Sequence, residues 1–267
     1  MIGKTGELLL RGLHAQWRSA IGWTLGIVAL AVMVGATWPT IRDSGMIAAF
    51  EQLDPRFLEA FGAADFMTPA GYLDGQLYAL LLPLVLAGMA IAATSALTAG
   101  DEEAGRLEFV AALPLSRRHL LLTRFAAVLV VLTGLAALTV LTIRGMREPF
   151  DLDVPFSRLV SATAGCLLLG VFHGALAYAI AGFGGSRAAC LGTTVTVLLA
   201  GYVADFLFPL SERLEDWQRI SPWWWAIGST PLGDGIDGSR AAALGVVTVL
   251  AVAVGTWAVG RRDLRGA

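Results

Sequence analysis

Apolar and polar stretches alternate along the chain in a pattern that predicts six membrane-spanning helices. Each apolar run is about 20 residues long or longer, which lets an α-helix cross the hydrocarbon layer of a membrane. Residues 1–18 alternate leucines and a tryptophan with basic residues, which is typical of a helix lying in the membrane interface. The six expected spans cover residues 21–38, 72–99, 120–143, 159–181, 188–208 and 241–260. The pattern therefore predicts an all-α polytopic membrane protein, with residues 1–267 forming a single transmembrane domain.

Between the spans, four connections are expected to differ in structure. Residues 41–70 carry phenylalanines and a leucine at helical spacing, which predicts a short helix packed on the outer surface. Residues 144–158 contain two prolines and predict a loop, and residues 182–187 are short enough for a tight hairpin only. Residues 209–238 hold four tryptophans, which favour the headgroup level. We expect this last connection to re-enter the outer interface before the sixth span.

Composition and the sorting of charge agree with this membrane assignment. Hydrophobic residues make up 56% of the chain and charged residues 15%, well below the roughly 25% of a soluble domain. With six spans, both termini lie on one side, and that side holds more than half of the lysines and arginines. The positive-inside rule then predicts cytoplasmic termini in a bacterial-type inner membrane.

The one long polar stretch that reads as structured runs from Gly100 to His119, on the predicted cytoplasmic side. Three acidic residues, 101–103, are expected to begin a short amphipathic helix, because a helix N-terminus favours negative charge. Glu102 and Arg106 stand four residues apart, the spacing of a stabilising ion pair. The apolar face of this helix is expected to hold Leu107, Val110 and Ala111.

The second half of the stretch predicts a corner that leads into the third span. Pro114 ends the amphipathic helix, and Ser116 can cap the next one. Arg117 and Arg124 are expected to reach lipid phosphates or a partner protein. A simpler alternative is a polar loop whose basic residues only anchor it to the membrane.

The spans carry little chemistry of their own. They contain no paired nucleophile and base, no cluster of metal ligands and no nucleotide-binding loop, which disfavours an intramembrane enzyme. Asp74 and Asp205 fall near the outer ends of their spans, which disfavours an ion-coupled transporter. His173 stands alone in the fourth span, where it either lines a pathway or bonds to a neighbouring helix. Energy for uphill transport would have to come from a partner.

The stretch GDEEAGRLEFVAALPLSRRHLLLTRF resembles the conserved cytoplasmic loop of the type-2 ABC transporter permeases, the ABC-2 family. In that family, acidic residues precede a Leu-Glu pair, an apolar stretch and a Leu-Pro-x-Ser-Arg motif. The outline of the chain also resembles the family, including a Ser-Pro turn at Ser221 and Pro222. The matching residues are Asp101, Glu102, Glu103, Gly105, Arg106, Leu107, Glu108, Leu113, Pro114, Ser116 and Arg117.

The resemblance implies the permease subunit of an ATP-driven exporter, in which this loop is the coupling helix seated in a groove of the ATPase. The implied partners are two ATPase subunits, membrane lipid and a second permease that is either identical or related to this one. The resemblance implies no nucleic-acid partner. ATP and Mg²⁺ would be bound by the ATPase, with no cofactor in this chain. With no large outer domain, a small amphipathic or hydrophobic substrate is favoured. The alternative is a secondary transporter or channel that works without an ATPase. The implied ATPase contacts are Asp101, Glu102, Glu103, Arg106, Leu107, Val110, Leu113, Pro114, Ser116 and Arg117.

Overall fold

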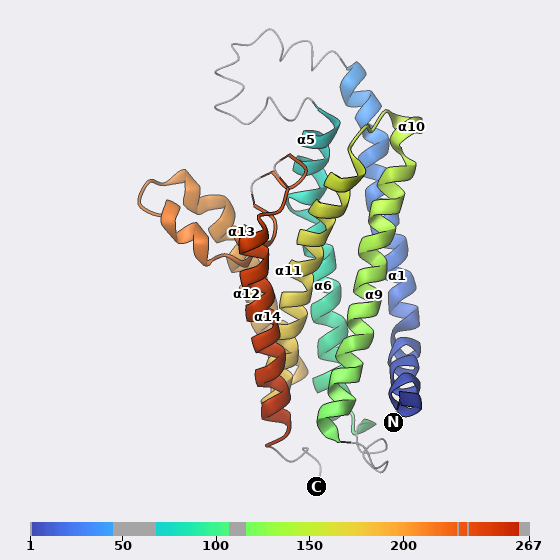
Figure 1. Ribbon diagram of the computed structural model, residues 1–267, viewed down its shortest axis with the longest axis vertical. Coiled ribbons are helices and arrows are strands. Elements are labelled where there is room, and N and C mark those ends of the chain that lie inside the picture. Colours follow the sequence, from blue (N-terminus) through green and yellow to red (C-terminus); the bar gives the residue numbers. More distant parts are fainter. Residues whose placement is uncertain (1, 45–67, 107–115, 229, 234, 262–267) are drawn as a thin grey trace.

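Six long helices run side by side and form an elongated bundle (Figure 1). The computed structural model describes residues 2–44, 68–106, 116–228, 230–233 and 235–261. Each of the six helices is long and apolar enough to cross a membrane, as the sequence pattern predicts. The start of the first helix and the end of the sixth lie at the same end of the bundle, as an even number of spans requires.

The six helices overlap the expected spans and extend beyond most of their ends, furthest at the start of the first. The first span is α1, and the second is built from α5, α6, α7 and two π-helical segments. The remaining spans are α9, α11, α12 and α14. Their bounds are α1 Ile2–Asp43, α5 Pro69–Leu73, α6 Leu81–Ser95, α7 Asp101–Glu103, α9 Arg117–Gly145, α11 Phe156–Gly182, α12 Arg187–Leu207 and α14 Gly238–Val259.

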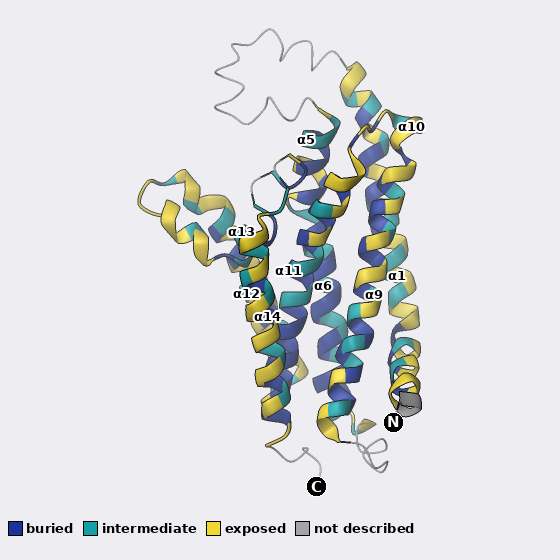
Figure 2. Ribbon diagram, in the orientation of Figure 1, coloured by how far each residue is buried: buried dark blue, intermediate teal, exposed yellow. Residues whose placement is uncertain are grey.

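Helices α11 and α6 form the centre of the bundle, while α1, α12 and α14 lie at its edge. Helix α11 packs extensively on both α6 and α14, and α1 packs mainly on α9. Figure 2 shows α6 and α11 mostly buried and α14 mostly exposed along its length. The exposed faces of the outer helices are apolar, with residues such as Leu25, Phe206 and Val249 uncovered. Such a surface suits a hydrocarbon environment, in which apolar side chains need no cover.

Helix α1 corrects one expectation, because it continues without a break through the region where an interfacial helix and a separate span were expected. The amphipathic residues 2–18 and the apolar run after them belong to one helix of 42 residues. Its first turns carry an exposed ion pair between Glu7 and Arg11, 2.7 Å apart. A change from polar to apolar side chains alters the surroundings of a helix but does not interrupt its backbone hydrogen bonds.

The second span is irregular at both ends of α6. Asp74–Tyr78 and Ala96–Gly100 are π-helical, so each segment carries one residue more per turn than an α-helix. Residues Ala79 and Leu80 join the first π-helical segment to α6, just before Pro83, which has no backbone N–H to donate. Such segments are found frequently at functional sites, which directs attention to the polar residues beside them.

The first part of the connection before the sixth span projects from the side of the bundle, and its last part packs against α11, α12 and α14 (Figure 1). The connection contains two 3₁₀ turns, Phe208–Leu210 and Glu215–Ile220, and the short helix α13, Pro222–Ala226. Ser221 caps α13 and donates a hydrogen bond to the Gly201 carbonyl at 2.7 Å. Trp223 differs from the expectation of a headgroup position. It is buried inside the protein, where its indole N–H donates to the Leu198 carbonyl at 3.0 Å.

Two shorter connections agree with their predictions. The hairpin between α11 and α12 turns at Gly184, whose φ of 82° favours glycine, and Ser186 then caps α12. The loop after α9 holds the one-turn helix α10, Arg147–Phe150. The short helix expected near residues 50–61 lies outside the described residues.

Candidate functional site

The acidic residues 101–103 lie at the C-terminal end of the second span, which corrects the expectation that they begin a new helix. Helix α7 continues directly from the π-helical segment Ala96–Gly100 and ends at Glu103. The backbone then turns at Gly105, whose φ of 68° is left-handed. Negative charge is unfavourable at a helix C-terminus, so these carboxylates need partners.

Asp101 finds its partners in two arginines. Its carboxylate is buried and forms ion pairs with Arg124 of α9 and with Arg106, the latter at 2.6 Å. The Arg124 guanidinium also donates to the Leu97 carbonyl at 2.6 Å. Arg124 was expected to reach lipid phosphates or a partner protein, and the structure corrects this: its side chain is only 14% exposed and is held inside the bundle. The ion pair of Arg106 with Asp101 was not indicated by the sequence spacing.

Glu103 connects the same turn to a third helix. Its carboxylate accepts a hydrogen bond from the Arg187 backbone N–H at 2.9 Å, at the first turn of α12. This N–H has no acceptor within its own helix, so Glu103 acts there as a distant capping group. Helices α7, α9 and α12 are therefore joined at one end of the bundle through two carboxylates.

The far side of the connector enters α9 as expected. Ser116 accepts a hydrogen bond from the His119 N–H at 3.3 Å and caps the helix. The Thr5 hydroxyl lies 3.2 Å from His119 Nε2, which adds α1 to the joined helices. Arg117 is exposed beside the cap. Four of the expected ATPase contacts lie outside the described residues: Leu107, Val110, Leu113 and Pro114.

His173 is buried in the centre of the bundle on α11. Its Nδ1 lies 2.8 Å from the Leu169 carbonyl, and since a carbonyl only accepts, Nδ1 carries the proton. The partner belongs to the same helix, in contrast to the neighbouring-helix bond that was one expectation. Nε2 has no hydrogen-bond partner among the described residues. The role of His173 in lining a pathway stays a prediction.

At the opposite end of the bundle, Asp74 holds the loop between α13 and α14. Both carboxylate oxygens accept from the Leu232 N–H, at 2.9 and 3.0 Å, and the Arg158 guanidinium donates to the Leu232 carbonyl at 3.0 Å. Sequence reasoning used Asp74 only to judge ion coupling and did not assign it this contact. The sequence did contain one indication of this contact: a carboxylate inside a predicted span needs a polar partner.

Replacing Asp74 with alanine is expected to lower the unfolding free energy by about 1–3 kcal/mol, since the buried Leu232 N–H loses its acceptor. Asp74→Asn keeps an acceptor oxygen and is expected to cost less. Thermal unfolding in detergent measures both variants. Asp216→Ala, which removes an exposed carboxylate from the outer connection, is the control and is expected to leave the melting temperature unchanged. Equal losses for Asp74→Ala and Asp216→Ala would contradict this assignment.

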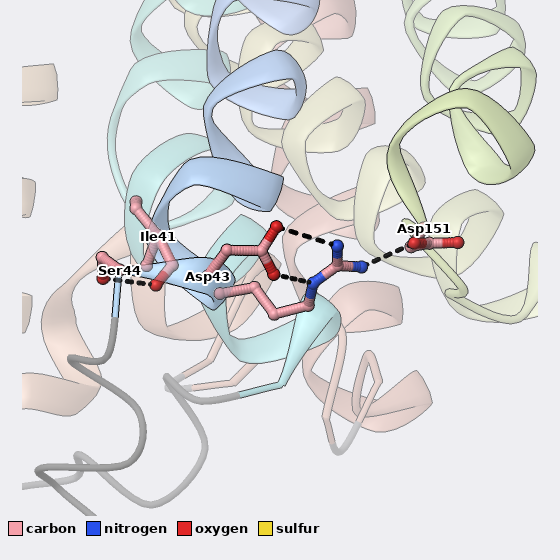
Figure 3. Close-up of polar contacts among 5 residues, drawn as sticks. Ile41, Asp43, Ser44 and Asp151 are labelled. Atoms are coloured by element: carbon pink, nitrogen blue, oxygen red, sulfur yellow. Dashed lines mark hydrogen bonds and ion pairs between the residues drawn. The ribbon is translucent and has the colours of Figure 1, made fainter.

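Three further carboxylates form contacts at the same end. Arg42, near the end of α1, lies between Asp43 and Asp151 and is 2.5 Å from the latter (Figure 3). Asp237 caps α14 by accepting from the Ser239 and Arg240 backbone N–H groups. The Ser239 hydroxyl, 2.6 Å from this carboxylate, and the two N–H groups hold the pKa of Asp237 below its ordinary value. These contacts fix loops and helix ends and contain no reacting group.

The arrangement of apolar helices and polar contacts defines a class of protein. A bundle of six apolar helices, with ionic contacts gathered at its two ends, is a multi-pass membrane protein. In the described part of the chain, no three His, Cys, Asp or Glu side chains lie together in a way that could hold a metal ion. The polar groups are placed to join helices at their ends.

Comparison with known families gives the particular assignment. The family described as "Multidrug efflux system permease Rv1217c, C-terminal domain" matches residues 12–260. The match covers nearly the whole chain, so the protein belongs to this family of transporter permeases, and the ABC-2 resemblance of the Gly100–His119 stretch is confirmed. No curated protein and no solved structure matches the chain.

Proposed function

We propose that this permease is the membrane-spanning subunit of an ATP-driven exporter and that the connector between α7 and α9 receives the force of ATP binding. The observation that supports this proposal is that polar contacts join several helices where the connector begins. Asp101 ties the end of the second span to α9, and Glu103 ties it to α12. A displacement of the connector is therefore transmitted to three helices at once. The described residues offer no other comparable junction at this end of the bundle.

In this proposal the carboxylates divide their roles. Asp101 is buried and bonded to two arginines, so it positions the connector and leaves surface contact to other residues. Glu102, Arg106, Ser116 and Arg117 flank the residues 107–115 and supply polar contacts at the rim of the ATPase groove. Leu107, Val110 and Leu113 are its apolar anchors and Pro114 its rigid corner. ATP and Mg²⁺ bind to two ATPase subunits in the cytoplasm, where both termini of this chain also lie.

A second permease completes the transporter in this proposal. Helices α1 and α12 are the least buried of the six, together with α14, and they expose apolar side chains. On α1, Gly22 and Gly26 are four residues apart, and neither has a neighbouring helix within 4 Å. Small residues at this spacing let two helices approach closely in a membrane. The matched family is described as a multidrug efflux permease, which supports a small amphipathic or hydrophobic substrate.

The proposal is tested by co-expressing the chain with the candidate ATPase from the neighbouring gene, purifying the complex and measuring drug-stimulated ATP hydrolysis. Co-purification and stimulated hydrolysis are expected. Charge reversal of Glu102 and Glu103 to lysine is expected to reduce stimulation roughly tenfold, because like charges at the edge of an interface weaken association.

Two controls separate contact with the ATPase from damage to the permease. Glu148→Lys reverses one carboxylate on α10, at the opposite end of the bundle, and should leave hydrolysis unchanged. Glu103→Gln keeps an acceptor for the Arg187 N–H and should preserve folding. Transport by vesicles that contain this chain alone, without the ATPase, would instead establish a secondary transporter or channel.

A further inference from the structure

An apolar groove of about 830 Å³ lies between α9 and α14, at the same end of the bundle as the connector. Phe125 and Leu129 of α9 form one wall, Val252 and Trp257 of α14 form the other, and Val171 of α11 lies on the floor. Figure 1 shows α9 and α14 on either side of α11 along this half of the bundle. The groove is open along its length, so in a membrane it faces lipid.

The depth of the groove corresponds to one leaflet. Its α9 wall runs from Arg118 to Leu129. At 1.5 Å per residue this stretch is about 16 Å long, roughly half of the 30 Å hydrocarbon layer. Apart from the hydroxyls of Thr248 and Thr256 and the Trp257 indole, every lining side chain beyond Arg118 is apolar. Each hydroxyl donates a hydrogen bond to the backbone carbonyl four residues earlier in α14. The walls therefore offer an acyl chain a continuous apolar surface.

Two arginines lie at the end of the groove where α9 begins and α14 ends. The Arg118 guanidinium rests against Gly260, so closely that a Cβ on this glycine would overlap it. The Arg261 guanidinium lies 4.4 Å from the centre of the Trp257 ring. In the described part of the chain, neither arginine forms an ion pair with a carboxylate. Two positive charges without a carboxylate partner among the described residues thus lie at the end of an apolar groove.

We propose that this groove binds one anionic phospholipid, with an acyl chain along Phe125 and Val252 and the headgroup phosphate between Arg118 and Arg261. Each basic residue near a membrane surface favours anionic lipid by about 1 kcal/mol, and here Arg118 lies against Gly260, the residue next to Arg261. A zwitterionic lipid brings its own cation to the same place and loses this preference. The site adjoins the connector, because Arg118 directly follows Arg117, but binding of lipid there does not depend on ATPase coupling.

The test is native mass spectrometry of the full chain, purified in mild detergent and incubated with equimolar dioleoyl phosphatidylglycerol and dioleoyl phosphatidylcholine. We expect each chain to retain one phosphatidylglycerol in preference to phosphatidylcholine. In the double variant Arg118→Gln/Arg261→Gln, this preference should fall about tenfold or more. The matched control Arg144→Gln/Arg213→Gln removes two other unpaired, exposed arginines near the opposite end of the bundle and should keep the preference.

A second pair of variants tests the groove itself. Ala253→Phe places a ring on its α14 wall and should reduce retention of both lipids, whereas Ala242→Phe, outside the groove on the same helix, should not. Melting temperatures of all variants verify that each is folded. The proposal is overturned by an unchanged preference in the folded arginine double variant. It is also overturned if Ala253→Phe leaves lipid retention unchanged, or if a hydrophobic drug occupies the groove without displacing phosphatidylglycerol.

Discussion

Asp101→Leu is expected to lower the unfolding free energy by about 3 kcal/mol or more, because it leaves the Arg124 guanidinium inside the protein without a counter-ion. Arg124 is 14% exposed and keeps only the Leu97 carbonyl as a partner in this variant. Arg124→Leu is expected to cost less, since Asp101 retains its ion pair with Arg106. Arg106→Leu should cost least, because the Arg106 side chain is 61% exposed and its ion pair is screened by water.

Thermal unfolding of the purified protein in one detergent gives this order directly. The double variant Asp101→Leu/Arg124→Leu is expected to recover part of the loss, because both charges leave the interior together. Arg147→Leu, which breaks the exposed ion pair with Asp153, serves as the control and should cost less than 1 kcal/mol. An Asp101→Leu protein as stable as this control would contradict the assignment of a buried ion pair.

The second large effect is expected at a close contact between the backbones of α11 and α14. A Cβ on Gly255 would lie 2.9 Å from Ala179 Cα, and one on Gly182 would lie 2.5 Å from the Gly255 carbonyl oxygen. Because the obstructing atoms belong to the backbone, neither contact can be relieved by a side-chain rotation. Gly255→Leu is therefore expected to separate the two helices, at a cost of about 3 kcal/mol or loss of the folded protein.

The matched variant is Gly245→Leu on the same helix, where nothing lies within 4 Å of an added Cβ. It should be neutral or slightly stabilising, because leucine favours a helix more than glycine does. Fluorescence-detected size-exclusion chromatography measures the fraction of monodisperse protein for both. A normal monodisperse yield and an unchanged melting temperature for Gly255→Leu would show that the helices are not in close contact.

The number and class of the helices were predictable because each depends on a local property, the length of an apolar run. The position of each helix in the bundle was not. In a membrane, helices that face lipid and helices that face protein carry equally apolar side chains, so hydropathy does not separate central α11 from peripheral α14. The close contact at Gly182 and Gly255 depends on two helices whose pairing the sequence does not show.

The position of the connector along the chain was predictable, but the contacts of its acidic residues were predictable only in part. The acidic residues 101–103 were identified as part of the connector, yet they were assigned to the start of a helix. Their role depends on Arg124, 23 residues later, and on the Arg187 N–H in another connection. A spacing rule such as i,i+4 sees only partners within the same helix. That rule indicated Glu102 as a partner of Arg106 but could not indicate the ion pair that Arg106 forms with Asp101, which also binds Arg124.

The burial of Trp223 also depends on residues that are distant in the sequence. Tryptophans next to a span favour the headgroup level as a class, and Trp217 is indeed exposed. Trp223 is buried because the Leu198 carbonyl accepts its indole N–H and Gly201 leaves room for its ring. Both partners belong to α12, and nothing local in residues 222–226 indicates them.

Because π-helical segments lie at both ends of α6, the number of residues in the second span determines which way its end residues point. Loss of one residue from Ala96–Gly100 would let an α-helical turn form there, and each residue of an α-helix turns the chain by about 100°. Asp101 would then point away from Arg124, although every side chain of the ion pair is still present. Between Tyr78 and Asp101, the protein should therefore be sensitive to any insertion or deletion, in addition to changes in its buried side chains. In this part of the permease, the count of residues is as much a structural requirement as their identity.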